Sequence, residues 1–278
     1  MKEKLTIPAG AEGFALLFDG KFRPVMPHHH DELEVNLILS GKAWYLFGNR
    51  RVPLRTGSMI WLFPRQEHLL IDWSRDFSMW VIVFKPRLVK QAAGSGDRRV
   101  LRSQDPGEVF CRQIDSRQVD FLNQVYEGAR RKDFDLEFTN AALTYAIVAS
   151  WQSYQFTNES LPLSDVHPAV AKAARIVATT EDVLPLEALA REAGLSPARL
   201  SRLFKQQAGI SLTLYRQRKC LERFLKIYRA GARYTLIEAA LLAGFGSYPQ
   251  FHRVFCREMQ MNPAAYRKVA GRDAQIGS

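Results

Sequence analysis

Three histidines and a glutamate in the N-terminal part of the chain have the types and spacing of metal ligands. His28, His30 and Glu34 lie close together, and His68 follows further along. In an extended segment, alternation puts His28, His30 and Glu34 on one face. Imidazoles and a carboxylate that converge suit Zn, Mn, Fe or Ni. The same side chains also suit contact with a small organic molecule or a structural role.

Two arginines in the C-terminal part occupy equivalent positions of an internal repeat. Leu186–Gly194 matches Leu236–Gly244. The segments that follow these two stretches also match each other, and their alignment pairs Arg202 with Arg253. An arginine that reaches a base edge can donate two hydrogen bonds to guanine O6 and N7. Both arginines could instead only solvate a helix surface, but their repetition in matching segments favours recognition of DNA.

Helical spacing predicts that further residues share the exposed stripe of each arginine. The candidate DNA-binding residues are Ala198, Arg199, Ser201, Arg202 and Lys205 in the first copy and Pro249, Gln250, His252 and Arg253 in the second. Ser201, Gln250 and His252 are candidate second contacts to bases. Arg199 and Lys205 are expected to bind phosphates, which position a protein on DNA without carrying sequence information.

Each copy of the repeat predicts a helix-turn-helix unit, over Pro185–Gln207 and Tyr234–Met259. A short helix ends in Ala-x-x-x-Gly, where the small Ala allows a close helix crossing and the Gly suits a tight turn. Ser196 and Ser247 are suitable N-caps for the second helix of each unit. Such a helix enters the major groove with its N-terminal half, so the paired arginines would lie near base edges.

One continuous helix is predicted between the two copies, over Leu212–Arg229. A helix of this length spans about 27 Å. It could hold two recognition helices near the roughly 34 Å repeat of successive major grooves on one side of the duplex. Some bending of the DNA is expected, because a straight duplex does not readily fit both helices at once.

The positive charge of the chain is concentrated in the part that holds the repeat. The formal net charge is +11, and residues 168–278 contain 18 Lys and Arg against 8 Asp and Glu. Residues 1–167 are nearly balanced, with 21 against 20. A local cationic excess favours a polyanion such as DNA through release of counterions from phosphates. A solvated basic surface would also explain this charge, so the motifs are needed to decide between DNA binding and a merely solvated surface.

Short alternating apolar segments up to Phe84 predict the strands of an antiparallel sandwich or small barrel. The clearest of them are Leu33–Leu39, Ala43–Phe47, Ser58–Phe63 and Phe77–Phe84. Lys85–Gly107 contains Pro, Gly-Ser-Gly and paired charges, which predict an irregular connection. Two helices are expected next, over Ser116–Arg131 and Phe138–Phe156, either packed on the sheet or paired with a second subunit in a homodimer.

The fold class expected from these patterns is α+β, with two domains. Thr157–Pro168 has the composition of a linker, so we expect domains over residues 1–157 and 168–270. No apolar run approaches the roughly 20 residues needed to cross a bilayer, and the N-terminus lacks the apolar stretch of a secretory signal. Cys111, Cys220 and Cys256 show no pairing motif and are expected to be reduced thiols. We therefore expect a cytoplasmic protein without a membrane partner.

The region from about Ala169 to Val269 resembles the DNA-binding domain of AraC/XylS-type transcription regulators. The motif that carries the resemblance is Ala239-Ala240…Gly244-Phe245…Phe251…Arg253-Val-Phe255…Pro263-x-x-Tyr266-Arg267. Cys256 and Gln260 depart from the family pattern, which usually has Lys and Gly there. The resemblance implies binding of double-stranded promoter DNA by both units, and commonly activation through contact with RNA polymerase.

The N-terminal histidines are similar to the two cupin motifs. His28-His-His30-Asp-Glu-Leu-Glu34 followed by Gly41 matches the first, and Gly57…Pro64…His68 matches the second. In metal-dependent cupins the corresponding residues are the ligands, whereas sensor domains of this regulator family often keep the pattern without a firmly bound metal. The resemblance implies a pocket for a small-molecule effector, and its expected walls are His28, His30, Glu34, Trp44 and His68.

We therefore interpret the chain as a sequence-specific transcription regulator, and not an enzyme, with a cupin-like β-barrel that senses a small molecule. Its C-terminal all-α domain would hold the two helix-turn-helix units joined by a long helix. The alternative is a metal-dependent cupin enzyme, such as an isomerase or dioxygenase, that carries a basic helical appendage. A DNA-repair or architectural protein built on the same two units ranks last, because no cysteine shows a cationic, exposed setting.

Overall fold

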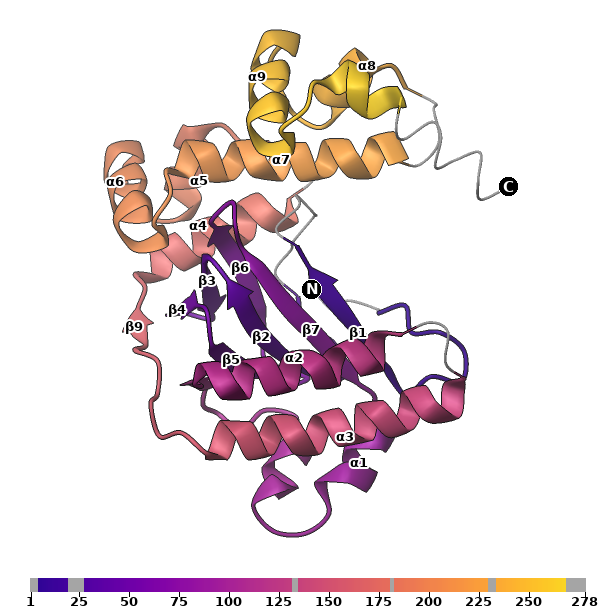
Figure 1. Ribbon diagram of the computed structural model, residues 1–278. Helices are drawn as coiled ribbons and strands as arrows, with labels where there is room; N and C mark the ends of the chain where they lie inside the picture. Colours follow the sequence, from indigo (N-terminus) through magenta and orange to yellow (C-terminus); the bar gives the residue numbers. More distant parts are fainter. Residues whose placement is uncertain (1–4, 20–27, 132–134, 181–182, 230–233, 269–278) are drawn as a thin grey trace. The chain divides into compact units, whose positions relative to one another are not determined.

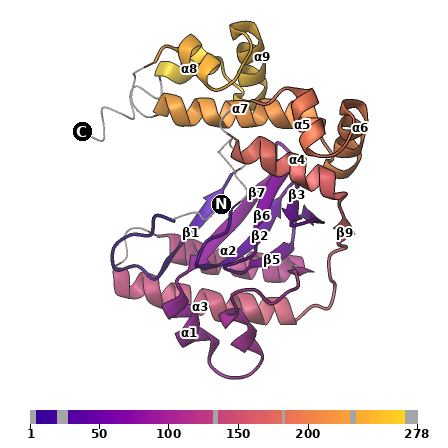
Figure 2. The same cartoon turned by 180° about the vertical axis from the view of Figure 1, so that it is seen from behind.

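The computed structural model describes residues 5–19, 28–131, 135–180, 183–229 and 234–268 (Figure 1). The chain forms two compact units, of which unit 1 extends to Asp165 and unit 2 begins at Val166. Unit 1 contains the β-sheets and the helices that cover them, and unit 2 is built of helices (Figure 2). Within the described residues, no helix combines the length and the apolar character that a membrane crossing requires.

Unit 1 is built on two antiparallel sheets, with strand orders β1-β7-β2-β5-β8 and β6-β3-β4-β9. The strands are β1 (Gly13–Phe18), β2 (Leu33–Ser40), β3 (Lys42–Phe47), β4 (Arg50–Arg55), β5 (Ser58–Leu62), β6 (His68–Trp73), β7 (Ser78–Phe84), β8 (Phe110–Gln113) and β9 (Ser164–Asp165). Gly41 links β2 to β3 with a φ of 76°, and a Cβ there would lie 2.7 Å from the Cα of Phe77. Only glycine can readily adopt this backbone conformation and also fit the space available at this turn.

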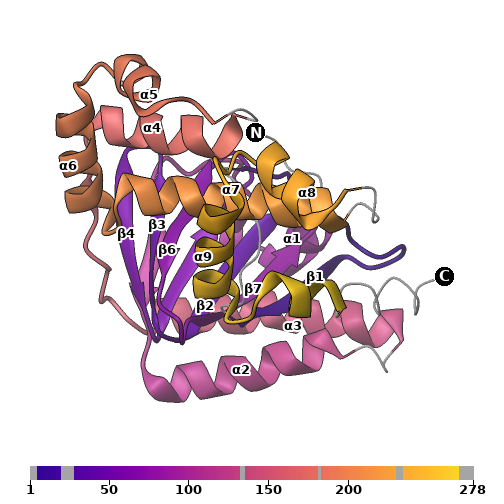
Figure 3. The ribbon, with the colours of Figure 1, turned by 90° about the horizontal axis from the view of Figure 1, so that it is seen from above.

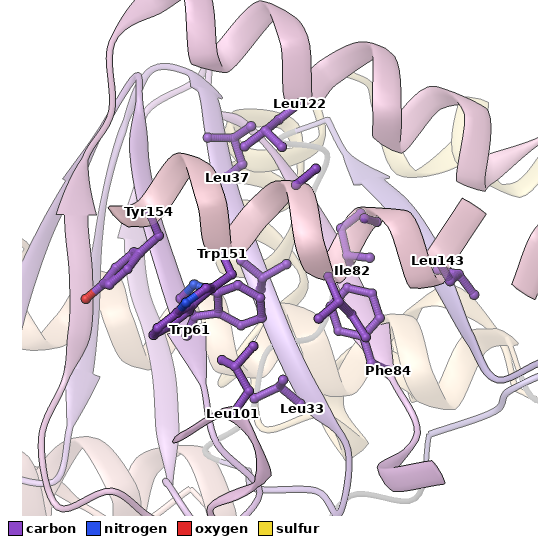
Figure 4. Close-up of a cluster of buried hydrophobic side chains, with 14 of the residues drawn as sticks. Leu33, Leu37, Trp61, Ile82, Phe84, Leu101, Leu122, Leu143, Trp151 and Tyr154 are labelled. Carbon is purple, nitrogen blue, oxygen red and sulfur yellow. The ribbon is translucent and has the colours of Figure 1, made fainter. Parts of the chain in front are cut away.

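Two helices, α2 (Ser116–Arg130) and α3 (Leu136–Gln155), cover the five-stranded sheet (Figure 1). Their apolar stripes and one face of the sheet form a continuous core, which includes Leu37, Trp61, Ile82, Leu122, Leu143 and Trp151 (Figure 4). Burial of each such aliphatic or aromatic side chain contributes about 1.5–3 kcal/mol. The hydroxyls of Tyr126 and Ser150 bond each other at 2.6 Å, which satisfies both groups inside this core. The sequence left packing on the sheet and pairing with a second subunit open, and the structure shows that these helices pack on the sheet.

Strand β2 shows the alternation that was predicted for it. Leu33, Val35 and Leu37 point into the core beneath the helices. Glu34 and Asn36 lie on the opposite face and bond each other, with Asn36 Nδ2 donating to Glu34 Oε1 at 2.6 Å. One strand therefore supplies apolar packing on one side and polar side chains on the other.

The prediction that Lys85–Gly107 is an irregular connection is wrong. The segment forms helix α1 (Pro86–Ala93) and a 3₁₀ helix, η1 (Asp97–Arg102). Pro86 stands in the first turn of α1, where its missing N–H is not needed, and Leu88 and Val89 are buried in the core. Asp97 accepts a hydrogen bond from Trp151 Nε1 at 3.0 Å, which ties η1 to α3. Tertiary burial thus orders a segment whose Gly-Ser-Gly stretch suggested a loop.

The segment Thr157–Pro168, predicted to be a linker, makes backbone hydrogen bonds to unit 1 and belongs to this unit as far as Asp165. The backbone N–H of Gln113 donates to the carbonyl oxygen of Glu159 at 2.9 Å, and β9 pairs with β4. Arg112 donates to the carbonyl oxygen of Thr157 at 2.8 Å. Polar residues without periodicity can still complete a sheet edge, because the backbone groups make the bonds.

Unit 2 is organised around the long helix α7 (Leu212–Arg229), whose bounds agree with the prediction. The other helices are α4 (Pro168–Thr179), α5 (Leu186–Glu192), α6 (Pro197–Ala208), α8 (Leu236–Leu242) and α9 (Tyr248–Met259). Tyr215 of α7 packs on Phe204 of α6, with ring centroids 5.3 Å apart. Further along α7, Phe224 packs on Phe251 and Phe255 of α9, with centroids 4.5 and 5.7 Å apart, where α9 crosses α7 (Figure 3).

The position of Phe224 makes it the main aromatic contact between α7 and α9. We expect Phe224→Ala to lower the free energy of unfolding of unit 2 by about 3–5 kcal/mol, the usual cost of removing a buried ring. Far-UV circular dichroism during urea unfolding measures the loss. All 5 tryptophans lie in unit 1, so the transition followed by tryptophan fluorescence should stay in place. Lys226→Ala, at an exposed site of the same helix, is the control, and equal stability of the two variants would contradict the assignment.

Candidate nucleic-acid interface and buried histidine cluster

The two helix pairs α5–α6 and α8–α9 have the same local construction. Gly194 and Gly244 adopt φ values of 72° and 94° between the helices of each pair. At Gly244 a Cβ would lie 2.1 Å from Val183 Cγ2, so the turn has neither the conformation nor the space for a side chain. Ser196 and Ser247 cap α6 and α9, each accepting a hydrogen bond from the backbone three residues on at 3.4 Å. The predicted caps of both helices are confirmed.

The face of α6 and α9 that packs inward is apolar, and the opposite face carries the predicted DNA-binding residues. The buried residues are Leu200, Phe204 and Ala208 in α6 and Phe251, Val254 and Phe255 in α9. The exposed candidates are Ala198, Arg199, Arg202, Lys205, Pro249, His252 and Arg253, while Ser201 and Gln250 are half-buried. Arg202 and Arg253 each stand six residues after the serine cap of their helix. The two arginines therefore occupy the same turn of equivalent helices.

Gln250 has a structural contact that the sequence did not indicate. Its Oε1 accepts a hydrogen bond from the backbone N–H of Gly246 at 3.0 Å. The side chain thus stabilises the turn before α9 through its carbonyl oxygen, and its amide NH2 group is not part of that bond.

The C-terminal end of α9 is fixed to α7 by an ionic network that motif analysis missed. Glu258 accepts from Arg218 Nε of α7 at 2.9 Å and from Arg257 Nε at 2.7 Å. Arg257 also donates to Gln217 of α7 at 3.3 Å. Because Glu258 is largely buried, this network helps to set the orientation of α9 on α7. The residues that α7 and α9 contribute to each of the two bonds between these helices are 40 residues apart in the sequence, so no local pattern links them.

In unit 1, strand pairing brings the predicted histidines together. His28 and His68 form an antiparallel bridge in which each N–H donates to the other's carbonyl oxygen, at 3.2 and 3.1 Å. The imidazoles of His28, His30 and His68 each offer one nitrogen, and these nitrogens all lie within 4.8 Å of one another. His30 and His68 are 1% and 2% exposed.

Backbone carbonyls fix the tautomers of the two buried histidines. His30 Nδ1 lies 2.9 Å from the carbonyl oxygen of Glu32, and His68 Nδ1 lies 3.0 Å from that of Gln66. A carbonyl oxygen can only accept, so each Nδ1 carries the proton. His30 Nε2 faces Glu34 Oε2 at 3.0 Å, whereas His68 Nε2 is buried without a hydrogen-bond partner among the described atoms.

The two buried imidazoles of the cluster differ in the direction in which their pKa values are shifted. Burial lowers the pKa of His68 to about 3, and the neighbouring His28 adds to this effect. Burial alone would also lower the pKa of His30, but its hydrogen bond and charge interaction with Glu34 raise it above the ordinary value. Burial would raise the pKa of Glu34, yet the bond and charge of His30 bring it to about 2. The cluster therefore holds an ionised carboxylate, an imidazole paired with it and a neutral imidazole.

Trp44 does not line this cluster, so its expected role as a wall of the site is corrected. Alternation along β3 puts Trp44 on the opposite face from Tyr45, and the guanidinium carbon of Arg51 lies 3.1 Å from the centre of the Trp44 ring. The residues that β3 supplies instead are Tyr45 and Phe47, whose ring centroids lie 5.9 and 6.3 Å from that of His68. The period of two along the strand could have identified them, once the inward face of β3 was known.

Comparisons with known proteins agree with this arrangement. Residues 19–116 match the family model described as AraC-like ligand binding domain, and residues 189–269 match one described as helix-turn-helix domain. The chain is 22% identical over 251 residues to the HTH-type transcriptional activator RhaR of Pectobacterium carotovorum subsp. carotovorum (strain PC1), covering 88% of this chain and 87% of that protein. It is 23% identical over 262 residues to RhaR of Escherichia coli O139:H28, covering 87% and 86%.

Among solved structures, the chain is similar to ToxT from Vibrio cholerae O395. The two are 14% identical, with 92% of this chain and 93% of that chain covered and a TM-score of 0.36.

A sheet-rich ligand-binding domain followed along the chain by two helix-turn-helix units defines a transcription regulator that binds DNA. The two family matches together cover more than half of the chain, and the chain belongs to the AraC-type transcription regulators. The alternative of a metal-dependent enzyme is not supported, since the relatives are regulators.

The buried, neutral His68 makes the stability of unit 1 depend on pH. Below pH 6.5 the unfolded chain binds a proton at this residue and the folded chain does not, so the free energy of unfolding falls as pH is lowered towards 3. His68→Gln cannot titrate, and between pH 6.5 and 4.5 its stability should fall less steeply, by up to about 1.4 kcal/mol per pH unit. Urea unfolding followed by tryptophan fluorescence, in the presence of a chelator, measures both slopes. His29→Gln is the control, and identical slopes for His68→Gln and wild type would contradict the expectation.

Proposed function

We propose that the chain activates transcription by binding two neighbouring segments of the major groove of promoter DNA, in response to a ligand bound by unit 1. The observation that carries this proposal is the equivalent, exposed placement of Arg202 and Arg253 on α6 and α9. A helix of this kind enters the major groove with its N-terminal turns foremost. Each arginine stands in the second turn after its cap, within reach of base edges.

The proposed contacts divide into two kinds. Arg202 and Arg253 donate to guanine, with Ser201, Gln250 and His252 as second contacts to bases. Arg199, Lys205 and the backbone at the start of each helix bind phosphates, and the small Ala198 and Pro249 allow close approach to the groove. At the positions equivalent to Arg199 and Lys205, α9 has Gln250 and Cys256, so α6 supplies more of the cationic contacts.

Activation and location in the cytoplasm belong to the same proposal. The relatives are named as transcriptional activators, which supports contact with RNA polymerase at the promoter. Promoter DNA and RNA polymerase are both found in the bacterial cytoplasm. Within unit 1, the proposed effector contacts are His28, His30, Glu34 and His68, which the strands bring together.

A homodimer through α3 is supported by an aromatic side chain on the surface of this helix. Tyr145 is 54% exposed. An exposed aromatic group of this size favours association with another surface. A second copy presents the same surface, which suits a two-fold interface.

The base contacts are tested by selecting bound sequences from a random DNA pool with wild type, Arg202→Ala and Arg253→Ala. We expect each variant to lose preference at a different base pair, by about 1–3 kcal/mol, which is roughly 5- to 150-fold in affinity. Binding to other sequences should change much less, because only one contact to a base is removed.

Lys205→Ala provides the matched comparison on α6. We expect it to weaken binding to all sequences alike and to reduce the slope of log affinity against log salt by about 0.9. Unchanged base preference in both arginine variants would falsify the assignment of these two helix faces.

The dimer is tested by the mass of the protein in solution. Wild type should have twice the chain mass of 31.7 kDa in light scattering after gel filtration. Tyr145→Glu places a charge on the exposed face of α3 and should give the monomer mass, whereas Lys90→Glu on α1 should not. A monomeric wild type, or a Tyr145→Glu variant that remains dimeric, would refute this interface.

A further inference from the structure

We propose that a cavity beside α7 binds one phosphate of the DNA backbone, on the stretch of duplex between the two major-groove segments. This inference rests on the proposed function and adds a DNA contact outside both helix pairs. The cavity has a volume of about 140 Å³ and lies within unit 2. Its polar walls are Thr213, Arg216 and Gln217 of α7 and Gln250 of α9.

The charge of the cavity wall favours an anion. The guanidinium of Arg216 is cationic, and none of the described residues that line the cavity is Asp or Glu. Arg216 Nη2 donates to the backbone carbonyl oxygen of Leu184, which holds the guanidinium in place. Within the described part of the chain, the other guanidinium nitrogens and the hydroxyl of Thr213 make no hydrogen bond. They are therefore available as donors to a ligand.

Both glutamines of the cavity use their carbonyl oxygen inside the protein. Gln217 Oε1 accepts a hydrogen bond from Arg257 Nη2 at 3.3 Å, and Gln250 Oε1 accepts one from the backbone N–H of Gly246 at 3.0 Å. The amide NH2 groups are not part of these bonds. A phosphodiester accepts hydrogen bonds and donates none, so a wall of guanidinium, hydroxyl and amide groups matches its chemistry.

The size of the cavity suits a phosphate group better than an organic effector. Pockets for organic ligands typically occupy about 300–1,000 Å³. A water molecule takes up about 30 Å³ in the liquid, so a cavity of about 140 Å³ has room for the oxygens of one phosphate. The sugars on either side of that phosphate would stay outside.

The position of the cavity along α7 points to a phosphate of DNA. Helix α7 packs on α6 through Tyr215 and on α9 through Phe224. Arg216 and Gln217 directly follow Tyr215, so the cavity lies between these two contacts. Gln250 belongs both to the cavity and to the first turn of α9. A duplex that reaches α6 and α9 therefore passes the cavity with its backbone between the two major-groove segments.

The contact supplies a cation that α9 itself lacks. At the positions where α6 has Arg199 and Lys205, α9 has Gln250 and Cys256. Contacts to phosphates fix the position of a protein on the duplex, and α9 has fewer side chains that can make them. Arg216, from the neighbouring helix, would take over this role for the second helix pair.

The contact is tested on the duplex that wild type selects from the random pool, with one phosphate at a time replaced by a neutral methylphosphonate. We expect one replacement between the two major-groove segments to weaken wild type about tenfold, the usual effect of losing a hydrogen bond to a charged group. In Arg216→Gln the same replacement should cost no more than about twofold, because the partner of that phosphate is already absent. Lys226→Gln removes a positive charge from an exposed site of the same helix and should keep the wild-type profile.

Thr213→Val tests the cavity without disturbing the bond from Arg216 to Leu184. It removes one hydroxyl at an exposed position, and the penalty of the same replacement should fall by about threefold, as for one neutral hydrogen bond. Circular dichroism shows which variants fold. Folded variants whose methylphosphonate profile equals that of wild type at every phosphate would overturn the proposal.

Inorganic phosphate separates a DNA contact from a site for a small phosphorylated molecule. We expect DNA binding to depend on Arg216 through one backbone phosphate. Saturable binding of inorganic phosphate that Arg216→Gln abolishes, together with an unchanged methylphosphonate profile, would overturn the assignment to DNA.

The failure of this contact and the failure of the proposed function give different results. Base preferences that change in Arg202→Ala and Arg253→Ala, with the same methylphosphonate profile in wild type and Arg216→Gln, remove the α7 contact and leave the regulator standing. If wild type selects no sequence, the proposed function fails and a duplex of arbitrary sequence decides the contact. Arg216→Gln should then lower the slope of log affinity against log salt by about 0.9, and an unchanged slope overturns the proposal.

Discussion

The packing of two helix pairs on one continuous helix is the constraint on which unit 2 depends. Helix α7 must present aromatic rings to α6 near its start and to α9 further along, through Tyr215 and Phe224. The inward faces of α6 and α9 are then fully used for packing. Their outward faces carry Arg202 and Arg253 into solvent, so the hydrophobic core decides which side chains can reach DNA.

In unit 1, as in unit 2, one face of an element packs in the core and the opposite face presents polar side chains, but here the element is a strand. Alternate residues of β2 fill the core beneath α2 and α3, and the remaining ones present Glu34 and Asn36 to the histidines. Burial then gives these polar groups unequal properties. Glu34 stays ionised because His30 pairs with it, while His68 stays neutral because burial opposes its charge. A site with fixed charge and fixed tautomers results from packing that is otherwise apolar.

Some elements were predicted well because their signals are local. The bounds of α7, the serine caps of α6 and α9 and the alternation of β2 depend on residues a few positions apart. Other elements were missed because they depend on distant partners. Helix α1 is stabilised by burial of Leu88 and Val89, and β9 exists because β4 offers an unpaired edge.

The sequence by itself determined the two repeated helix pairs, their caps, the positive charge around them and the resemblance of the histidine motifs to those of cupins. Only the tertiary structure decided that Tyr45 and Phe47, and not Trp44, face His68, and that Glu258 ties α9 to α7. It also decided which nitrogen of each buried histidine carries the proton. The physical reason is range: periodicity and capping act within a few turns of chain, whereas strand register and buried polar contacts join residues that the sequence keeps far apart.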